Sequence, residues 1–320
     1  MDRYALLTVD TEALPKRAAA DHVQRLIWGR HAAGTAGIRE ICAIGAEFGV
    51  KHVFFVDMCA SPRYTDAMRE VVGWLDGAGQ DVQLHLHPET LAREFWGSHG
   101  LPPEPLYINE YEGAARAMFL LKHFGGLLRE ITGKPVRACR AGSFRWNADF
   151  IRALDAAGIP LSFNNSMRAY MTGRAPYAVP TNLPYTWSNG IIEVPVTEKY
   201  IAPQGARRER WVSLAYPESS YFPFKTRRFV GMPRFLDGGL PFAVLLLHSW
   251  SFLYWNEKRQ AVYLDNGRLD AYRVLMARVA ADYDVVTTPE FLELCRRGKI
   301  KTGPRVDLRL AEQQGGNRNA

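Results

Sequence analysis

Two stretches of the sequence decide its architecture: Thr8-Val9-Asp10-Thr11-Glu12 and Gln83-Leu84-His85-Leu86-His87-Pro88-Glu89. Each belongs to a short apolar run of the kind that forms a buried β-strand. Because side chains alternate along an extended chain, Asp10 and Glu12 share one side, and His85 and His87 share one side. Two imidazoles and a carboxylate on one surface suit a divalent transition metal, and a second carboxylate suits a general base. Either pair alone is equally well explained as an ordinary polar strand end.

Strand and helix patterns alternate along the chain. Apolar, β-branched runs predict strands over residues 4–9, 51–57, 81–85, 136–140, 161–163, 191–195, 243–248 and 284–287. Helical spacing predicts helices over residues 36–48, 65–75, 110–132, 147–157, 265–283 and 289–296. This alternation predicts a parallel α/β fold, either open or closed into a barrel. We expect one domain over residues 1–298 with an irregular insertion at about 200–239, and a partly disordered tail over residues 299–320.

Polar side chains follow the apolar strands where each strand ends. Ligands gather at the carboxyl ends of the strands in a parallel sheet. A candidate catalytic group stands at this point after nearly every strand: Asp10 and Glu12, Asp57, His85 and His87, Arg140, and His248. The pattern predicts an active site at this edge, although Asp57 is equally suited to capping the turn that follows it.

The composition is that of an ordinary globular protein. The chain has 320 residues, of which 47% are hydrophobic and 23% charged. Its four cysteines lack C-x-x-C spacing, which predicts neither a disulfide framework nor a zinc finger. We recognise no signal peptide and no apolar run long enough to span a membrane, so we expect a cytoplasmic location. The net charge is +7, but no nucleic-acid-binding motif accompanies it, and nucleic acid is not an expected partner.

Six segments in order resemble those of the NodB-type polysaccharide deacetylases, carbohydrate esterase family 4. They span residues 8–12, 48–56, 77–88, 136–142, 245–248 and 284–292. The resemblance implies a distorted (β/α) barrel with about seven parallel strands. It also implies a metal-dependent hydrolase that removes acetyl groups from sugars, with one divalent ion, most simply zinc.

The resemblance implies a catalytic or metal-binding role for each residue of this chain that matches a functional position of the family motifs. Asp10 would act as the base, Arg140 would orient it, and His248 would protonate the leaving group. Glu12, His85 and His87 would bind the metal.

The chain departs from the family pattern at three places. Thr11 replaces the second aspartate of the first motif, and a D-x-[DE] variant of that motif makes Glu12 the carboxylate ligand. The family histidines are usually four residues apart, whereas His85 and His87 are two apart, so either His87 or Glu89 could be the third ligand. Gly142 and Ser143 replace the usual proline and tyrosine of the third motif. This replacement affects the expected acetyl-binding pocket more than the metal site.

Three further positions are candidates for substrate binding. Trp250 could stack on a sugar ring, and Asn164 and Asn165 could contact sugar hydroxyls, whereas core packing and loop capping are the alternatives. The predicted insertion holds a group of basic residues that could grip a nucleotide or lipid diphosphate carrying the sugar, or could simply be solvated: Arg207, Arg208, Arg210, Lys225, Arg227 and Arg228.

Three functions fit the sequence. The first is an N-deacetylase in glycan or surface-polysaccharide biosynthesis. The second is a metal-dependent amidohydrolase acting on a small cyclic amide. The third is a catalytically inactive, glycan-binding homologue.

Overall fold

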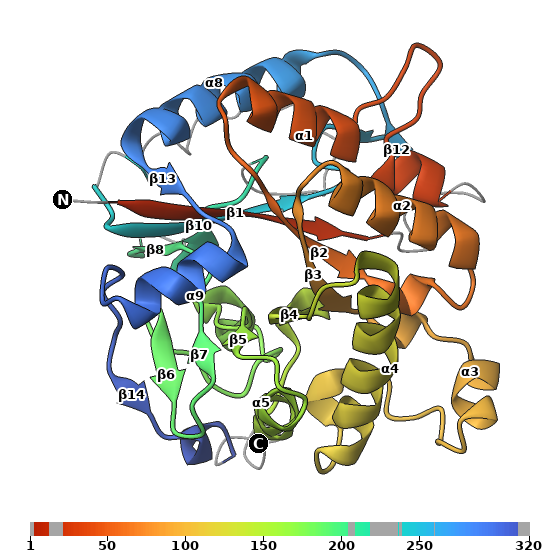
Figure 1. Ribbon diagram of the computed structural model, residues 1–320, viewed down its shortest axis with the longest axis vertical. Helices are drawn as coiled ribbons and strands as arrows, with labels where there is room; N and C mark the ends of the chain where they lie inside the picture. The colour runs from red at the N-terminus through yellow and green to blue at the C-terminus, as the bar shows by residue number, and fades with distance from the viewer. Residues whose placement is uncertain are drawn as a thin grey trace. The chain divides into compact units, whose positions relative to one another are not determined.

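The computed structural model describes residues 3–12, 22–203, 209–217, 236, 239–258 and 260–312. They fall into two compact units (Figure 1). The first unit comprises Met1–Val82 and Leu214–Ile300, and the second comprises Gln83–Ser213 and Lys301–Ala320. Strand β3 (Asp81–Leu86) begins in the first unit and ends in the second.

Strand β1 (Tyr4–Thr11) is the centre of the first unit. It pairs in parallel with β10 (Phe242–His248) and with β2 (Val53–Asp57), and β13 (Asp284–Val285) pairs in parallel with its first residues. Every residue of β1 is buried. A strand buried on both faces needs apolar residues at consecutive positions, which is why this segment reads as a continuous apolar run.

Helices flank this sheet. In α1 (Ile38–Glu47), buried Ile38, Ile41 and Ile44 form the stripe that the helical spacing predicts. Helix α8 (Gly267–Asp282) lies beside α1 (Figure 1). The unit also contains helices α2 (Thr65–Gly77), α9 (Thr288–Arg296), η2 (Val23–Ile27) and η3 (Met58–Ala60), and the hairpin of β11 (Tyr254–Trp255) with β12 (Ala261–Val262).

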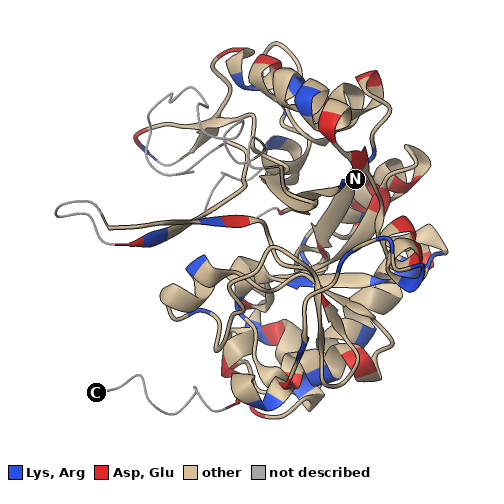
Figure 2. Cartoon of the chain, turned by 90° about the vertical axis from the view of Figure 1, so that its left-hand side faces the viewer, with Lys and Arg blue, Asp and Glu red and all other residues tan. Residues whose placement is uncertain are grey.

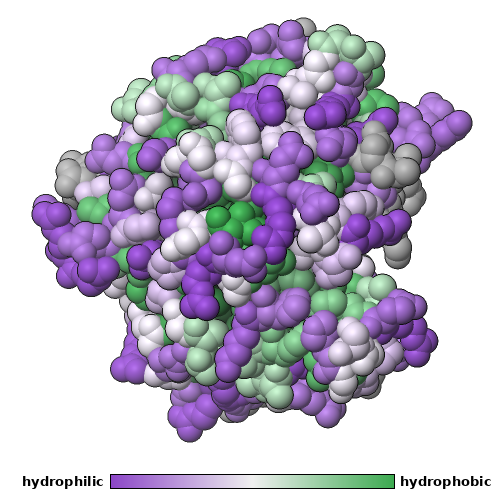
Figure 3. All heavy atoms as spheres, turned by 45° about the vertical axis from the view of Figure 1, so that its right-hand side comes forward, coloured by the Kyte–Doolittle hydropathy of each residue, from purple (hydrophilic) through white to green (hydrophobic). Residues whose placement is uncertain are grey.

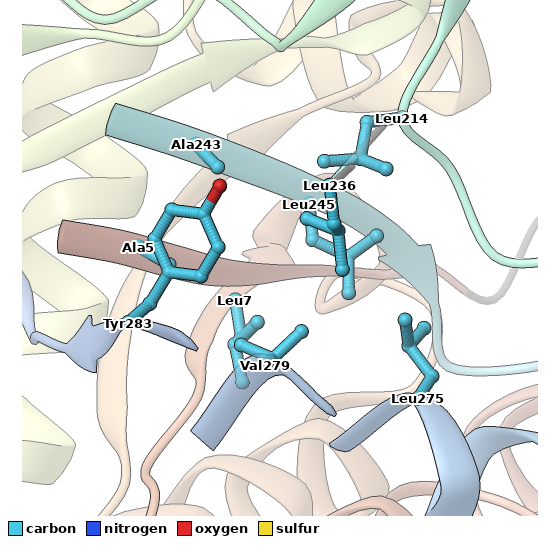
Figure 4. A pocket seen from close by; sticks show the side chains of 9 residues that line it. All are labelled: Ala5, Leu7, Leu214, Leu236, Ala243, Leu245, Leu275, Val279 and Tyr283. Carbon is cyan, nitrogen blue, oxygen red and sulfur yellow. The ribbon is translucent and has the colours of Figure 1, made fainter. Parts of the chain in front are cut away.

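Helix α8 closes an apolar pocket against β1 and β10 (Figure 4). Leu7 and Leu245 face Val279 of α8, and Tyr283 brings the only hydroxyl group among the lining side chains. The contact removes alkyl surface from water on both sides, and such burial is the main stabilising term in a core.

We expect Val279→Ala to lower the free energy of unfolding by about 2 kcal/mol, because it deletes buried methyl groups beside a pocket that cannot collapse fully. Val274→Ala on the same helix is the matched control, since Val274 is 71% exposed. It should be neutral or slightly stabilising because alanine favours helix. Urea unfolding of both variants measures the difference, and equal stabilities would contradict this packing.

The second unit contains further paired strands. Strands β3, β4 (Ala138–Ala141), β5 (Leu161–Ser162) and β7 (Ile192–Glu193) are parallel neighbours in that order. Strand β6 (Tyr185–Trp187) is antiparallel to β7, and β14 (Arg305–Val306) is parallel to β6. The helices and remaining strands are α3 (Arg93–Ser98), α4 (Ala115–Thr132), α5 (Ala148–Ala156), α6 (Met167–Met171), η4 (Pro88–Thr90), η5 (Ile108–Glu110), η6 (Gly142–Phe144), η7 (Leu308–Ala311), and the hairpin of β8 (Glu198–Ile201) with β9 (Arg210–Ser213).

Buried Glu198 anchors the base of the β8–β9 hairpin. Its carboxylate accepts hydrogen bonds from the hydroxyls of Ser166 at 2.8 Å and Ser213 at 3.0 Å, and from the backbone N–H of Met167 at 2.6 Å. The hairpin extends outward from the rest of its unit (Figure 2). It occupies part of the stretch expected to be an irregular insertion, while β14 and η7 occupy part of the expected tail.

Charged residues lie mainly on the outer faces of the helices (Figure 2), and hydrophilic residues cover most of the face in Figure 3. None of the helices within the described ranges is long and apolar enough to cross a membrane.

Candidate active site

Three polar side chains meet at the carboxyl ends of β1 and β10 in the first unit. Asp10 pairs in register with His248, and Glu12 follows the last residue of β1. Glu12 Oε1 lies 4.0 Å from His248 Nε2, and ligand atoms of all three residues lie within 4.8 Å of one another. Asp10 and Glu12 are only 4% and 3% exposed. Two buried carboxylates and an imidazole can accept a proton, donate one, or contribute to a metal site.

The turn after β10 fixes this group. The N–H of Ser249 donates to the carbonyl of Asp10 at 2.9 Å, and the Ser249 hydroxyl accepts from the N–H of Glu12 at 3.4 Å. The hydroxyl of Ser251 accepts from the N–H of His248 at 2.9 Å. These serines were not identified from the sequence. Their signal is weak, since two serines after a strand look like ordinary turn residues.

Two histidines lie at the carboxyl end of β3 in the second unit. His85 and His87 are 0% and 2% exposed, and their ring centroids are 4.8 Å apart. His85 Nδ1 lies 2.8 Å from the carbonyl oxygen of Arg140, and His87 Nδ1 lies 2.7 Å from Glu89 Oε1. A carbonyl or carboxylate oxygen can only accept, so each Nδ1 carries the proton. In the neutral ring the lone pair is then on Nε2, which is the arrangement typical of metal-ligating histidines.

The bond from His87 gives Glu89 a supporting position. A carboxylate that accepts from the Nδ1–H of a histidine fixes the ring and makes its Nε2 more basic. This geometry favours His87 over Glu89 as the third ligand, a choice that the sequence left open.

Gly142 allows the His87 ring to lie where it does. A β-carbon at Gly142 would be 2.4 Å from His87 Nδ1, closer than real side-chain carbons approach. Glycine at this position therefore has a steric reason in this chain.

Arg140 is the penultimate residue of β4 and is 1% exposed. Its register partner on β3 is His85, whose ring it holds through its carbonyl oxygen. Its Nε lies 3.4 Å from the carbonyl oxygen of Phe163, and the next N–H, of Ala141, donates to Asn164 Oδ1 at 2.8 Å.

A buried carboxylate, Glu193, supports this edge from β7. It accepts from the N–H groups of Asn164 and Asn165 at 2.6 and 2.8 Å, from the Ser162 hydroxyl at 2.5 Å and from Trp187 Nε1 at 3.1 Å. Burial raises the pKa of Glu193, whereas these donors lower it. The sequence signal was a lone glutamate within an apolar run, which we did not interpret.

The predicted substrate-binding residues are buried. Asn165 Oδ1 accepts from the N–H of Val179 at 2.8 Å, so Asn164 and Asn165 both make loop-capping contacts. Trp250 is 1% exposed, and its ring centroid lies 4.3 Å from that of His248. Direct sugar contacts by these three residues stay predictions. The Asp57 carboxylate accepts from the N–H of Cys59 at 3.1 Å and caps the turn.

Most of the predicted basic insertion lies outside the described residues, including Arg207, Arg208, Lys225, Arg227 and Arg228. Arg210 is described, and it is exposed on β9.

No protein-family model matches the chain, and no curated protein matches it. The solved structures with a similar fold include the following two. The first, assigned as a polysaccharide deacetylase from Mycobacterium smegmatis, is 18% identical with a TM-score of 0.58, covering 95% of this chain and 92% of that one. The second, a 4-alpha-glucanotransferase from Thermococcus litoralis, is 13% identical with a TM-score of 0.55, covering 96% of this chain and 42% of that one.

The likeness to the Mycobacterium smegmatis structure confirms the predicted fold class. The chain has the NodB-type α/β barrel fold. At these identities the likeness concerns the fold alone, and the second structure is named for a different reaction. Function must therefore be argued from the site.

We expect Gly142→Ala to weaken zinc binding at least about tenfold, because the new methyl group displaces the His87 ring from Glu89 and such supporting contacts contribute on this scale. Gly126→Ala on α4 is the matched control, since a β-carbon there meets nothing within 4 Å. Competition against a chromophoric chelator measures both affinities. Equal affinities in the two variants would show that His87 does not bind the metal as argued.

Proposed function

We propose that this protein is a metal-dependent hydrolase that removes the acetyl group from an N-acetylated sugar. The observation that carries the proposal is the pair of buried histidines with both Nδ1 atoms engaged by acceptors. Burying two imidazoles costs desolvation free energy, and the packing of an apolar core does not require such residues. The family resemblance of the sequence supports the reaction class.

The proposed ligands are Glu12, His85 and His87, binding one divalent ion, most simply zinc. Their donor atoms suit it, since an imidazole–imidazole–carboxylate set is a common catalytic zinc site that leaves positions open. Such an ion would supply Lewis acidity toward the acetyl carbonyl and toward water.

The chain's own residues supply the proton transfers. Asp10 would take a proton from the attacking water, and His248 would give one to the departing amine nitrogen. Their register on β1 and β10 holds the two groups side by side. By the family resemblance of the sequence, Arg140 would orient Asp10. Ser249 and Ser251 would keep the backbone of both proton-transfer residues in place.

Asp10 has an alternative role as a metal ligand. With Glu12 and His248 it forms a second group of candidate ligands within the first unit. The two assignments differ in one measurable consequence. A general base can lose its charge without loss of the metal, whereas a ligand cannot.

The metal assignment is tested by zinc content. We expect about one equivalent in the wild type and in Asp10→Asn, and much less in His85→Ala, because removing one of three ligands weakens binding strongly. His99→Ala is the matched control, since His99 is exposed on the second unit. Full zinc in His85→Ala would exclude this site, and its loss in Asp10→Asn would make Asp10 a ligand.

The reaction is tested by acetate release. Zinc-loaded wild type should deacetylate a member of a panel of N-acetyl sugars, nucleotide-linked sugars and lipid-linked sugars. Asp10→Asn and His248→Ala should each reduce turnover by roughly 10²-fold or more, the usual contribution of a general acid or base. His99→Ala should be unaffected.

Two outcomes of the same panel would contradict the deacetylase proposal. Hydrolysis of a cyclic amide without acetate release would identify an amidohydrolase. Sugar binding with no hydrolysis by the zinc-loaded protein would identify an inactive glycan-binding homologue.

A further inference from the structure

We propose that Arg145, Arg168 and Arg174 form a binding site for an oxyanion, a phosphate or carboxylate group on the carbohydrate substrate. The inference rests on the proposed function, because that function is what makes the substrate a carbohydrate. It differs from the predicted role of the insertion, because none of these arginines belongs to that stretch.

Arg145 and Arg174 both lie beside η6, which follows β4 in the second unit, and the charges of Arg145 and Arg168 both act on Arg174. Arg174 Nη1 donates to the carbonyl oxygen of Ser143 at 3.2 Å, and its Nε lies 3.0 Å from the hydroxyl of Thr172. Arg145 lies two residues after Ser143 in the chain. Arg168 belongs to α6, whose C-cap residue, Thr172, precedes Arg174 by two residues. The backbone N–H of Arg174 donates to the carbonyl of Ala169 at 3.0 Å, which folds this segment back onto α6.

The cluster has no counter-charge in direct contact. Among the described residues, no carboxylate forms an ion pair with any of the three guanidinium groups. Burial lowers the pKa of Arg174, the charges of Arg168 and Arg145 lower it further, and Glu198 raises it. The Glu198 carboxylate, however, is already occupied by neutral donors from Ser166, Met167 and Ser213. Like charges held together in this way repel, and a bound anion would relieve that repulsion.

The guanidinium groups are positioned and accessible. Arg145 lies over the ring of Tyr107, with Cζ 4.1 Å from the ring centroid, and its guanidinium donates to no described residue. Arg168 is exposed, and Arg145 and Arg174 are partly exposed. A stacked arginine loses little further freedom when it binds, and its planar fork matches the oxygens of phosphate or carboxylate.

The cluster borders the histidine pair through one short segment, η6. Gly142 of η6 packs against the His87 ring, and the carbonyl of Ser143 receives Arg174. Ser143 and Phe144 both have left-handed backbone conformations, with φ of 54° and 55°. Such conformations are costly for residues with side chains and persist where the surroundings enforce them, often beside functional sites. An anion held by the arginines would therefore lie next to the segment that positions His87.

Oxyanion binding by the full-length, zinc-loaded protein tests the proposal without requiring turnover. Inorganic phosphate and glucuronate serve as probes, titrated calorimetrically at constant ionic strength because salt screens such contacts. We expect at least one probe to bind the wild type. It should bind Arg174→Gln and Arg145→Gln about tenfold more weakly or worse, the scale of a charged hydrogen bond. Arg129→Gln on exposed α4 surface is the matched control and should bind like the wild type.

The outcomes separate the possible sources of the anion. Preference for phosphate would indicate a phosphate-linked sugar, and preference for glucuronate an acidic sugar. Arg145→Gln removes no described hydrogen bond, so it tests the site even if Arg174→Gln unfolds. The proposal is overturned if neither probe binds, if the cluster variants bind like Arg129→Gln, or if chelating the zinc abolishes binding while the arginine variants retain it. Absence of acetate release would instead contradict only the deacetylase assignment and would leave the oxyanion site unaffected.

Discussion

The parallel pairing of β1 with β10 is the constraint on which the group of Asp10, Glu12 and His248 depends. Its register sets Asp10 opposite His248, at the point where both apolar strands end. A shift of β10 by one residue would bring Leu247 opposite Asp10 and turn the imidazole to the other face of the sheet. Register-specific hydrogen bonds oppose this shift: the Thr8 hydroxyl donates to the carbonyl of Leu245 at 2.7 Å, and the N–H of Ser249 donates to the carbonyl of Asp10 at 2.9 Å.

The histidine pair of the second unit also depends on strand register. Pairing of β3 with β4 sets His85 opposite Arg140, and the carbonyl of Arg140 then selects the tautomer of the ring. Arg140 thus has two functions, since its backbone orients a histidine while its side chain supplies a positive charge. Glu193 stabilises the neighbouring loop through four donors and no described cation, so its support is directional rather than ionic.

Much of the fold was readable from the sequence because its long elements carry strong patterns. The continuous apolar runs of β1 and β10 and the spaced isoleucines of α1 predicted their elements within a few residues. Strands β6 and β14 were not predicted, because they have only three and two residues, too few for a periodic pattern. The β8–β9 hairpin was missed because Glu198 is held by Ser166 and Met167, which lie about thirty residues earlier in the chain.

The site was predictable to the same degree and for the same reason. Asp10, His85 and His248 lie near the ends of recognisable strands. The rule that ligands bind at the carboxyl ends of parallel strands was therefore enough to identify them. The tautomers of the histidines depend on acceptors such as Glu89 and the Arg140 carbonyl, which only the folded chain places. The arginine cluster joins residues from separate loops, and no local spacing brings Arg145 and Arg174 together.

The central claim is that the buried histidines bind a metal through Nε2 together with Glu12. Anomalous diffraction at the zinc edge from crystals of the zinc-loaded protein tests it most directly. The account predicts one strong peak at about 2.0–2.1 Å from Nε2 of His85 and of His87 and at about 2.0–2.2 Å from a carboxylate oxygen of Glu12. A peak bound through Nδ1, a peak held by other residues, or no peak near the histidines would contradict it.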